Sequence, residues 1–521
     1  MKRYEEALQA HERAIEIDPD HAGAHTNRGL VLQYLDRHEE ALAANDRALE
    51  IDPDSAVAYY NRGFVLRSLG RHEKVLEAWE RSLALDSDQA DVWNDKGLSL
   101  ANLGRYPEAL AAYSRALEID PKYAFAHHNR GNTLLALHKL GEAVKSYTEA
   151  IRLAPEDPTP YFSRGNAYRD LHEFEKARAD YVKAISFDEN FEAAWTNLGR
   201  MLLLNLHEPR KALPALQTAV ALSPDAVTHH NLGLVYTALD RYEDAVAEFG
   251  LGLALEPRDM WLSINIKQGV ALVLGREYKD ALAAFDSALR IEERNFSARW
   301  WRGFVLRQMQ RYDDARKKYG NLAADSPKTA DAHSEHGRAL AELGRFPEAA
   351  VALARAKEIA AEDPWVLWAQ WSILTRQGKH AEAVPVAHKL VGAGMREDDL
   401  DSALCAVMLV SSLRAAGQAT EAQRVATTHA KGTPRRCRRL AFAYLCAAAG
   451  KRDEATRLLE SWDLPWQPED LYDRARVHAV LGQRKEALSW LGRAVEKGLS
   501  RSANAAPDAE LASFKIPATV R

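Results

Sequence analysis

A glycine recurs at a nearly fixed interval through most of the chain, and this period constrains the fold more than any other feature. Successive members are 34 residues apart, except for one interval of 36 residues. A period of this length is typical of a repeat architecture, in which each unit packs on its neighbours and the units share one continuous core. The recurring glycines are Gly29, Gly63, Gly97, Gly131, Gly165, Gly199, Gly233, Gly269, Gly303 and Gly337.

Each unit is predicted to contain two helices, because its apolar residues follow helical rather than alternating spacing. Twelve residues after most of the glycines stands an alanine or valine, as at Ala109 and Ala143. Glycine and alanine are expected where the two helices cross, since a larger side chain would push the backbones apart. Dipeptides such as Gly104-Arg105 make the turn within a unit, and Asp-Pro ends one unit and starts the next. Large rings are expected to wedge into the neighbouring helix at Trp79, Tyr113, Tyr147, Tyr181, Phe249, Phe285 and Tyr319.

The spacing of glycine, alanine, aromatic and proline residues resembles the tetratricopeptide repeat family over residues 1 to about 360. The resemblance implies an all-α fold, a right-handed superhelical α-solenoid of stacked helix-turn-helix hairpins. It also implies a concave groove lined by the first helix of each hairpin.

Four segments are predicted. Residues 1–20 form a half repeat with only its second helix, and residues 21–360 form about ten regular units. Residues 361–497 form about four divergent hairpins, and residues 498–521 form a C-terminal cap or tail. In the divergent hairpins the crossing glycine is replaced by Trp371, Val410, Ala443 and Ala475.

The missing first helix of the half repeat is expected to leave Tyr4, Ala7 and Leu8 partly uncovered. We therefore expect either that the chain is the remainder of a longer protein or that it associates with itself through this uncapped N-terminal helix.

An asparagine stands two residues before five of the glycines, on the expected inner face of the first helix. Asparagine is a poor residue for a helix interior, but its amide complements a peptide backbone. The row resembles the asparagine ladder in the repeat arms of O-linked N-acetylglucosamine transferases, which implies binding of an extended peptide. The alternative is that these amides bond between adjacent first helices. The row comprises Asn27, Asn61, Asn129, Asn197 and Asn231.

An arginine lies beside the glycine in several units, as in the repeated tripeptide Asn-Arg-Gly. We expect its stem to pack between hairpins and its guanidinium to pair with a nearby carboxylate. The arginines are Arg28, Arg62, Arg130, Arg164 and Arg302.

Aromatic rings, arginines and an asparagine are also predicted to line the groove. Aromatic and arginine side chains are the usual anchors of protein interfaces, and core packing is the alternative for each ring. The candidates are Tyr60, Phe64 and Arg67 in one unit, Asn166 and Arg169 in a second, and Trp300, Trp301, Phe304 and Arg307 in a third.

A basic section at residues 422–452 contains no acidic residue. Its cluster of Arg435, Arg436, Arg438 and Arg439 is a candidate polyanion patch. A solvated helix face is the favoured interpretation, and nucleic acid is not expected as a partner.

No catalytic motif, cofactor motif or metal site is found, so we do not predict an enzyme. His333 and His336 share a helix face, but a third ligand is not evident. Three cysteines are too few and too scattered for a disulfide framework, which favours a reducing, cytoplasmic compartment. No apolar run is long enough for a membrane helix, and the amphipathic N-terminus has no signal-peptide core.

The main hypothesis is a non-catalytic scaffold that binds a partner protein or an extended peptide in its groove. One alternative is the recognition arm of an enzyme whose catalytic domain, for example a glycosyltransferase, is absent from this chain. The other is a regulatory protein whose basic C-terminal section contacts nucleic acid.

Overall fold

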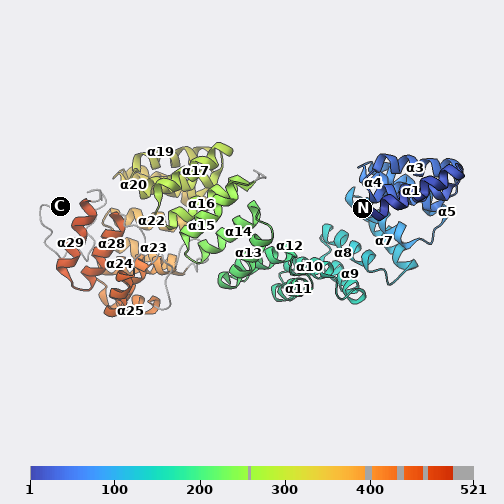
Figure 1. The fold of residues 1–521 in the computed structure, drawn as a ribbon. Helices are drawn as coiled ribbons and strands as arrows, with labels where there is room; N and C mark the ends of the chain where they lie inside the picture. Colours follow the sequence, from blue (N-terminus) through green and yellow to red (C-terminus); the bar gives the residue numbers. More distant parts are fainter. Residues whose placement is uncertain (1, 256–259, 393–401, 431–438, 462–467, 497–521) are drawn as a thin grey trace. The chain divides into compact units, whose positions relative to one another are not determined.

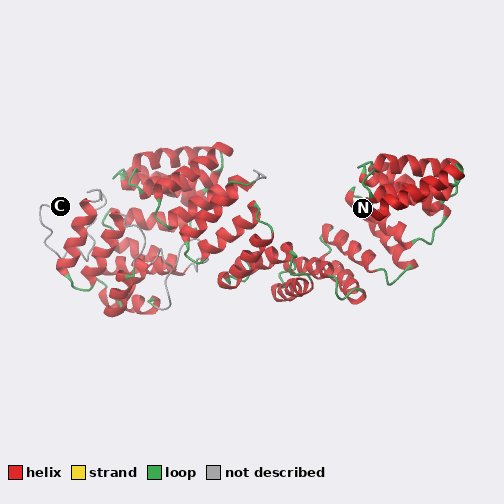
Figure 2. Cartoon of the chain, in the orientation of Figure 1, coloured by secondary structure: helices red, strands yellow, loops and turns green. Residues whose placement is uncertain are grey.

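The computed structural model describes residues 2–255, 260–392, 402–430, 439–461 and 468–496. Within these ranges the chain forms helices joined by loops, and no strand is found (Figure 2). The helices pack in antiparallel pairs, each pair following the last along the chain (Figure 1). The prediction of an all-α solenoid built from helical hairpins is confirmed.

The chain divides into two compact units, residues 1–222 and 223–521. Unit 1 contains α1 (Lys2–Ile17), α2 (Ala22–Tyr34), α3 (His38–Ile51), α4 (Ala56–Ser68), α5 (His72–Leu85), α6 (Ala90–Asn102), α7 (Tyr106–Ile119), α8 (Ala124–Ala136), α9 (Leu140–Leu153), α10 (Pro158–Asp170), α11 (Phe174–Phe187), α12 (Glu192–Leu204) and α13 (Pro209–Leu222). After α1, the even-numbered helices are the first helices of the hairpins.

Unit 2 continues the same alternation of first and second helices. It contains α14 (Ala226–Ala238), α15 (Tyr242–Leu253), α16 (Trp261–Leu274), α17 (Tyr278–Ile291), α18 (Phe296–Gln308), α19 (Tyr312–Asp325), α20 (Ala330–Glu342), α21 (Phe346–Ala360), α22 (Pro364–Arg376), α23 (His380–Gly392), α24 (Ser402–Ala415), α25 (Ala419–His429), α26 (Arg439–Ala448), α27 (Arg452–Glu460), α28 (Pro468–Val480) and α29 (Arg484–Glu496).

The turn inside each hairpin contains a residue in the left-handed region. In the first hairpin the N–H of Asp36 donates to the carbonyl of Gln33 at 3.1 Å, and the N–H of Arg37 donates to the carbonyl of Leu32 at 2.9 Å. These two bonds form a Schellman motif, which satisfies the free carbonyls at the helix end. The left-handed residue is glycine in some hairpins, as at Gly104, and another residue elsewhere, as at His138.

The turn between hairpins differs from the prediction. Asp52 caps the C-terminus of α3, and its carboxylate accepts the N–H of Asp54 at 3.2 Å. Pro53 therefore lies in the connecting loop, and α4 begins only at Ala56, after its N-cap Ser55. The expectation that Asp-Pro itself starts the next helix is wrong here, because the aspartate side chain organises a short loop first.

The repeated glycine forms the notch into which the ring of the second helix fits. A Cβ placed on Gly131 would lie 2.5 Å from the ring of Tyr147, and one on Gly97 would lie 2.6 Å from the ring of Tyr113. Both rings are completely buried. The predicted helix crossing at glycine is confirmed, and the absence of a side chain there makes room for the largest core residues.

The N-terminal helix corrects one expectation. Leu8 is only 3% exposed, because it packs in a core cluster with Val31, Leu32 and Leu42 from α2 and α3. Tyr4 is 40% exposed and stacks on Tyr34, with their ring centroids 5.1 Å apart. The expectation is thus wrong for Leu8, which receives its cover from the following hairpin, whereas Tyr4 and Ala7 stay partly uncovered as expected.

Unit 2 brings hairpins that are distant in sequence together. Tyr242 and Leu274, from its first two hairpins, pack in the same core cluster as Val477 and Leu481 at its last hairpin. Beside them, Arg276 forms an ion pair with the buried carboxylate of Asp470 at 2.8 Å. The helices of unit 2 therefore curl far enough for the turn after α16 to meet the first turn of α28.

Candidate functional site

A chain of polar side chains connects the first helices of unit 1. The hydroxyl of Tyr60 on α4 donates to Asp95 of α6 at 3.0 Å, and the amide of Asn94 donates to the same carboxylate at 3.3 Å. From α8, the side-chain amide of Asn129 donates to the side-chain oxygen Oδ1 of Asn94 at 3.0 Å. Burial raises the pKa of the Asp95 carboxyl, although the Tyr60 hydroxyl, Arg67 and Asn94 act in the opposite direction.

The polar chain continues into the next two hairpins. His128 on α8 shares a hydrogen bond with the hydroxyl of Ser163 on α10 at 3.0 Å. The side-chain amide of Asn197 on α12 donates to the side-chain oxygen Oδ1 of Asn166 at 2.8 Å, and the hydroxyl of Tyr181 donates to the same oxygen at 2.8 Å. The amides of adjacent hairpins thus satisfy one another.

The five asparagines of the predicted ladder have different environments. Asn61 and Asn231 are buried, with exposed fractions of 7% and 5%. Asn129 and Asn197 are half-buried and bonded to neighbouring first helices, whereas Asn27 is exposed. For Asn129 and Asn197 this geometry fits the alternative that the amides join adjacent hairpins.

The arginine of the repeated tripeptide has the structural role expected of it. Arg62 pairs with Asp46 of the preceding hairpin at 2.6 Å, and Arg164 makes two bonds of 2.8 Å to Asp180. The other pairs are Arg28 with Glu12 at 3.6 Å and Arg302 with Asp286 at 2.8 Å. Arg130 instead donates to the hydroxyl of Ser146 at 3.2 Å. The prediction of pairing with a carboxylate is therefore confirmed for four of the five arginines.

One of the predicted aromatic anchors, Trp300, is buried, and the others are half-buried: Tyr60, Phe64, Trp301 and Phe304. Trp300 is 8% exposed, stacks on Phe304 with centroids 5.7 Å apart, and meets the ring of Trp365 edge-on at 5.4 Å. Trp301 stacks on Phe285, with centroids 6.2 Å apart. Core packing is thus the geometry of Trp300, which offers little surface to a ligand.

Arg67 and Arg169 remain accessible on the first helices of unit 1. About a third of each side chain is exposed. Arg67 lies over the ring of Phe64 at 4.5 Å, and its guanidinium is 4.0 Å from Asp95. Arg169 pairs with its neighbour Asp170 at 2.8 Å.

The first helices of unit 2 enclose a cleft of about 290 Å³, which we call the unit 2 cleft. Six successive hairpins contribute to it through α18, α20, α22, α24, α26 and α28. In five of them the lining includes the residue directly after the crossing position, so the same face of each helix points inward. These five residues are Arg338, Ser372, Ser411, Tyr444 and Arg476.

One end of the unit 2 cleft holds a network of buried ion pairs. Glu335 pairs with Arg338 and lies 3.5 Å from Arg307. Glu342 pairs with Arg376 at 2.5 Å and lies 4.0 Å from Arg307. Burial and the nearby Arg307 lower the pKa of Arg338; burial also acts to lower the pKa of Arg307, but Glu335 and Glu342 raise it overall. Both guanidiniums remain charged at any physiological pH.

Two of the arginines in the unit 2 cleft lie over aromatic rings. The guanidinium of Arg338 lies over the ring of Trp368 at 4.2 Å, and that of Arg476 lies over Tyr444 at 4.7 Å. Arg476 also pairs with Asp473 at 3.2 Å and donates to the hydroxyl of Ser411 at 3.1 Å. The cleft therefore offers fixed positive charge next to flat apolar surfaces.

Sequence reasoning found only one member of this site, Arg307. It missed Arg338, Glu342, Trp368, Arg376 and Arg476. Glu335 could have indicated the site, because it occupies the inner-face position that holds asparagine in several other units. A buried carboxylate needs a cation, so a glutamate at this position predicts arginines nearby.

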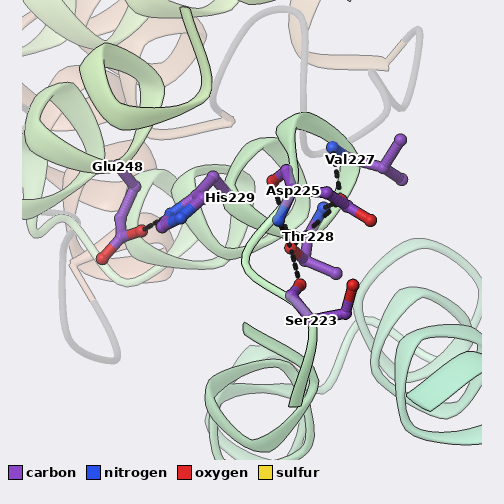
Figure 3. Close-up of polar contacts among 6 residues, drawn as sticks. All are labelled: Ser223, Asp225, Val227, Thr228, His229 and Glu248. Atoms are coloured by element: carbon purple, nitrogen blue, oxygen red, sulfur yellow. Dashed lines mark hydrogen bonds and ion pairs between the residues drawn. The ribbon is translucent and has the colours of Figure 1, made fainter. Parts of the chain in front are cut away.

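The entry into unit 2 is a capped helix start (Figure 3). The carboxylate of Asp225 accepts the N–H groups of Val227 and Thr228 at 2.9 and 2.8 Å, while the N–H of Asp225 donates to the Thr228 hydroxyl at 3.1 Å. This capping box fixes the first turn of α14. One turn later, His229 lies 2.7 Å from Glu248 and joins α14 to α15.

The remaining candidates give no further site. Arg435, Arg436 and Arg438 lie outside the described residues, and Arg439 is the first residue of α26. His333 bonds to the carbonyl of Pro327, and the described ranges contain no group of three potential metal ligands. Among the described helices, none combines the length and apolar character needed to span a membrane.

Models of the tetratricopeptide repeat match most of the chain. Those described as TPR repeat match residues 1–36, 97–138, 131–171 and 165–204. Those described as tetratricopeptide repeat match residues 20–88, 201–258, 305–364 and 471–493. The chain belongs to the tetratricopeptide repeat family. Repeats of this kind build extended surfaces for protein–protein interaction.

Named relatives are more distant. Anaphase-promoting complex subunit 3 of Schizosaccharomyces pombe is 27% identical over 163 residues, 30% of this chain and about a quarter (24%) of that protein. Among solved structures, YrrB, titled a TPR protein with an unusual peptide-binding site, is 26% identical over 36% of this chain and 96% of its own, with a TM-score of 0.32. Yeast Tom70 is 17% identical over 84% of this chain and 99% of its own, with a TM-score of 0.41.

Proposed function

We propose that this chain is a non-catalytic scaffold that binds an extended segment of a partner protein along the inward faces of its first helices. The observation that carries the proposal is the unit 2 cleft, to which six successive hairpins contribute side chains from one helix face. A site assembled from equivalent positions of successive repeats suits a ligand that runs from repeat to repeat.

The chemistry of the cleft also supports binding rather than catalysis. Its carboxylates are held in ion pairs with arginines, and arginine does not exchange protons at neutral pH. Rings and guanidiniums are the side chains that contribute most to protein interfaces.

A reducing compartment remains part of this proposal. Cys405 and Cys446 are buried, and burial raises the pKa of Cys446 to about 11. A buried protonated thiol is unreactive, which suits a cysteine retained for packing.

Site-specific photo-crosslinking in cells that produce the protein tests the proposal. A photo-reactive amino acid replaces Phe64 or Arg376 on first helices, and Leu251 or Val351 on second helices serves as the matched control. Leu251 and Val351 are exposed, at 52% and 66%, so they are at least as accessible as the two test positions.

We expect one contiguous partner segment to crosslink from Phe64 or Arg376 and not from the control positions. The proposal fails if the second-helix positions capture the same segment equally well. It also fails if neither first-helix position captures a protein segment.

A further inference from the structure

The charge balance of the unit 2 cleft identifies the chemistry of the segment that it takes. We propose that the cleft is an anchor site for one acidic side chain, aspartate or glutamate, of an extended protein segment, with an apolar neighbour of that residue against the tryptophans. This inference rests on the proposed scaffold function and adds the class of ligand.

Positive charge exceeds negative charge in the described part of the cleft. Four arginines line it, at 307, 338, 376 and 476. They share three carboxylates, those of Glu335, Glu342 and Asp473. One guanidinium charge is therefore uncompensated in a largely desolvated site, which is unfavourable until an anion enters.

The hydrogen-bonding groups of the network are incompletely matched. The Nε–H groups of Arg307 and Arg338 make no hydrogen bond, and the two residues are 9% and 4% exposed. The Nε of Arg307 faces an oxygen of Glu335 at 3.5 Å, and that oxygen also makes no hydrogen bond. The surplus charge is therefore what favours an anion, and an incoming carboxylate neutralises it while carrying only acceptors.

The size and surroundings of the cleft indicate a single side chain flanked by apolar surface. A volume of about 290 Å³ lies at the lower end of the range for ligand sites, roughly 300–1,000 Å³. Trp368 and Trp371 form part of its wall and are half-buried, so they can cover an apolar neighbour of the acidic residue. The single surplus charge matches a carboxylate better than a doubly charged phosphate.

The test uses the full chain and two libraries of nine-residue peptides, acetylated and amidated at their ends. The libraries have randomised apolar residues around a central glutamate or, in the second library, a central glutamine. We expect selected glutamate peptides to bind roughly 10- to 100-fold more tightly than their glutamine counterparts, as for hydrogen bonds to charged groups.

Matched variants locate the effect. Arg307→Gln combined with Arg376→Gln is expected to remove the preference for glutamate. The matched control is Arg169→Gln in unit 1. Arg169 stands four residues after its repeat glycine, as Arg307 does. This control is expected to preserve the preference for glutamate. Circular dichroism checks that each variant folds. If the double variant unfolds, Arg376→Gln alone replaces it. In that single variant Arg307 and Arg338 still neutralise Glu335 and Glu342.

The outcomes separate the anchor from the scaffold function. Equal binding of glutamate and glutamine peptides, lost in Trp368→Ala, overturns the acidic anchor and leaves the scaffold function supported. Tighter binding of phosphoserine peptides than glutamate peptides also overturns the acidic anchor. An absence of binding by both libraries, together with an absence of crosslinks from first helices, overturns both proposals.

Discussion

The first helices of the two units solve the same packing problem with different chemistry. In unit 1 neutral amides and hydroxyls bond across adjacent hairpins, as Asn129 does to Asn94 and Asn197 does to Asn166. In unit 2 the corresponding faces of α18, α20 and α22 carry arginines and glutamates in buried ion pairs. Amide pairs leave no net charge, whereas the ion-pair network leaves a surplus that a ligand can neutralise.

Hairpins also differ in which helix supplies the large side chain at the crossing. In most hairpins of unit 1 a glycine on the first helix receives a ring from the second helix, as Gly131 receives Tyr147, and the same holds in the first three hairpins of unit 2. In α22 and α23 the sizes are exchanged, because Trp371 stands at the crossing position and the small residue Ala387, sixteen positions later, lies in the cluster against which it packs. Either helix can therefore supply the large side chain at the crossing.

The largest effect is expected from removing the exchanged tryptophan. Trp371→Ala deletes a large side chain from the core and the donor to Ser412 at 2.8 Å, so it should destabilise the surrounding hairpins by roughly 3–5 kcal/mol. Hydrogen exchange of α22–α25 measures the loss locally. Trp195→Ala, which removes a half-buried tryptophan of unit 1, is the control, and an equal effect of the two substitutions would contradict the exchanged-volume account.

A methyl group added at a crossing glycine should be accepted or rejected according to whether a ring lies opposite the glycine. Gly131→Ala forces the buried ring of Tyr147 to move, which should cost roughly 1–3 kcal/mol. The added methyl group of Gly337→Ala meets no ring; its two nearest neighbours are the carbonyl of Ala349 at 3.2 Å and the Cβ of Ala352 at 3.5 Å. There the better helix propensity of alanine, up to about 1 kcal/mol, should offset the closer contact. Urea denaturation followed by hydrogen exchange measures the stability of both variants. A similar loss of stability at both sites would show that the opposing ring does not decide whether the crossing accepts alanine.

Removing the amides tests whether the polar chain of unit 1 is structural. Asn129→Ala and Asn197→Ala should each cost roughly 0.5–1.5 kcal/mol while barely changing the helix content. Asn27→Ala, at the exposed member of the row, should have almost no effect on stability. Denaturation midpoints and far-ultraviolet circular dichroism measure both quantities. If Asn27→Ala destabilises the protein as much as the other two, the bonds between hairpins are not the reason for the asparagines.

The smallest expected effect is on how the stability of the protein depends on pH. Burial lowers the pKa of His128, so its neutral form is favoured in the folded state. The contribution of neutral His128 to the free energy of unfolding is fully present above the pKa of the unfolded chain, about 6.5. It is lost as the pH falls through the lower pKa of the folded state. His128→Gln should flatten the pH dependence of the melting temperature over this window, whereas a variant at the exposed His138 should not. An unchanged pH profile in His128→Gln would exclude this histidine as the cause.

Local sequence was sufficient to determine the repeat and its internal packing. The period, the crossing glycine and the ring that fills its notch could be read directly, because each depends on residues within one hairpin. The ion pair of Arg62 with Asp46 joins two adjacent hairpins, and it was also foreseeable, because neighbouring repeats pack at a fixed spacing.

Only the tertiary structure decided which inward residues are accessible and which distant ones meet. Sequence could not show that Leu8 is covered, that Trp300 is buried, or that Arg307 and Arg476 line one cleft. The cover of Leu8 comes from the neighbouring hairpin of unit 1, whereas the meeting of Arg307 and Arg476 depends on how strongly unit 2 curls, as the ion pair of Arg276 with Asp470 reflects. Curvature is the sum of small rotations between successive hairpins, so it is a property of many interfaces together and of no single motif.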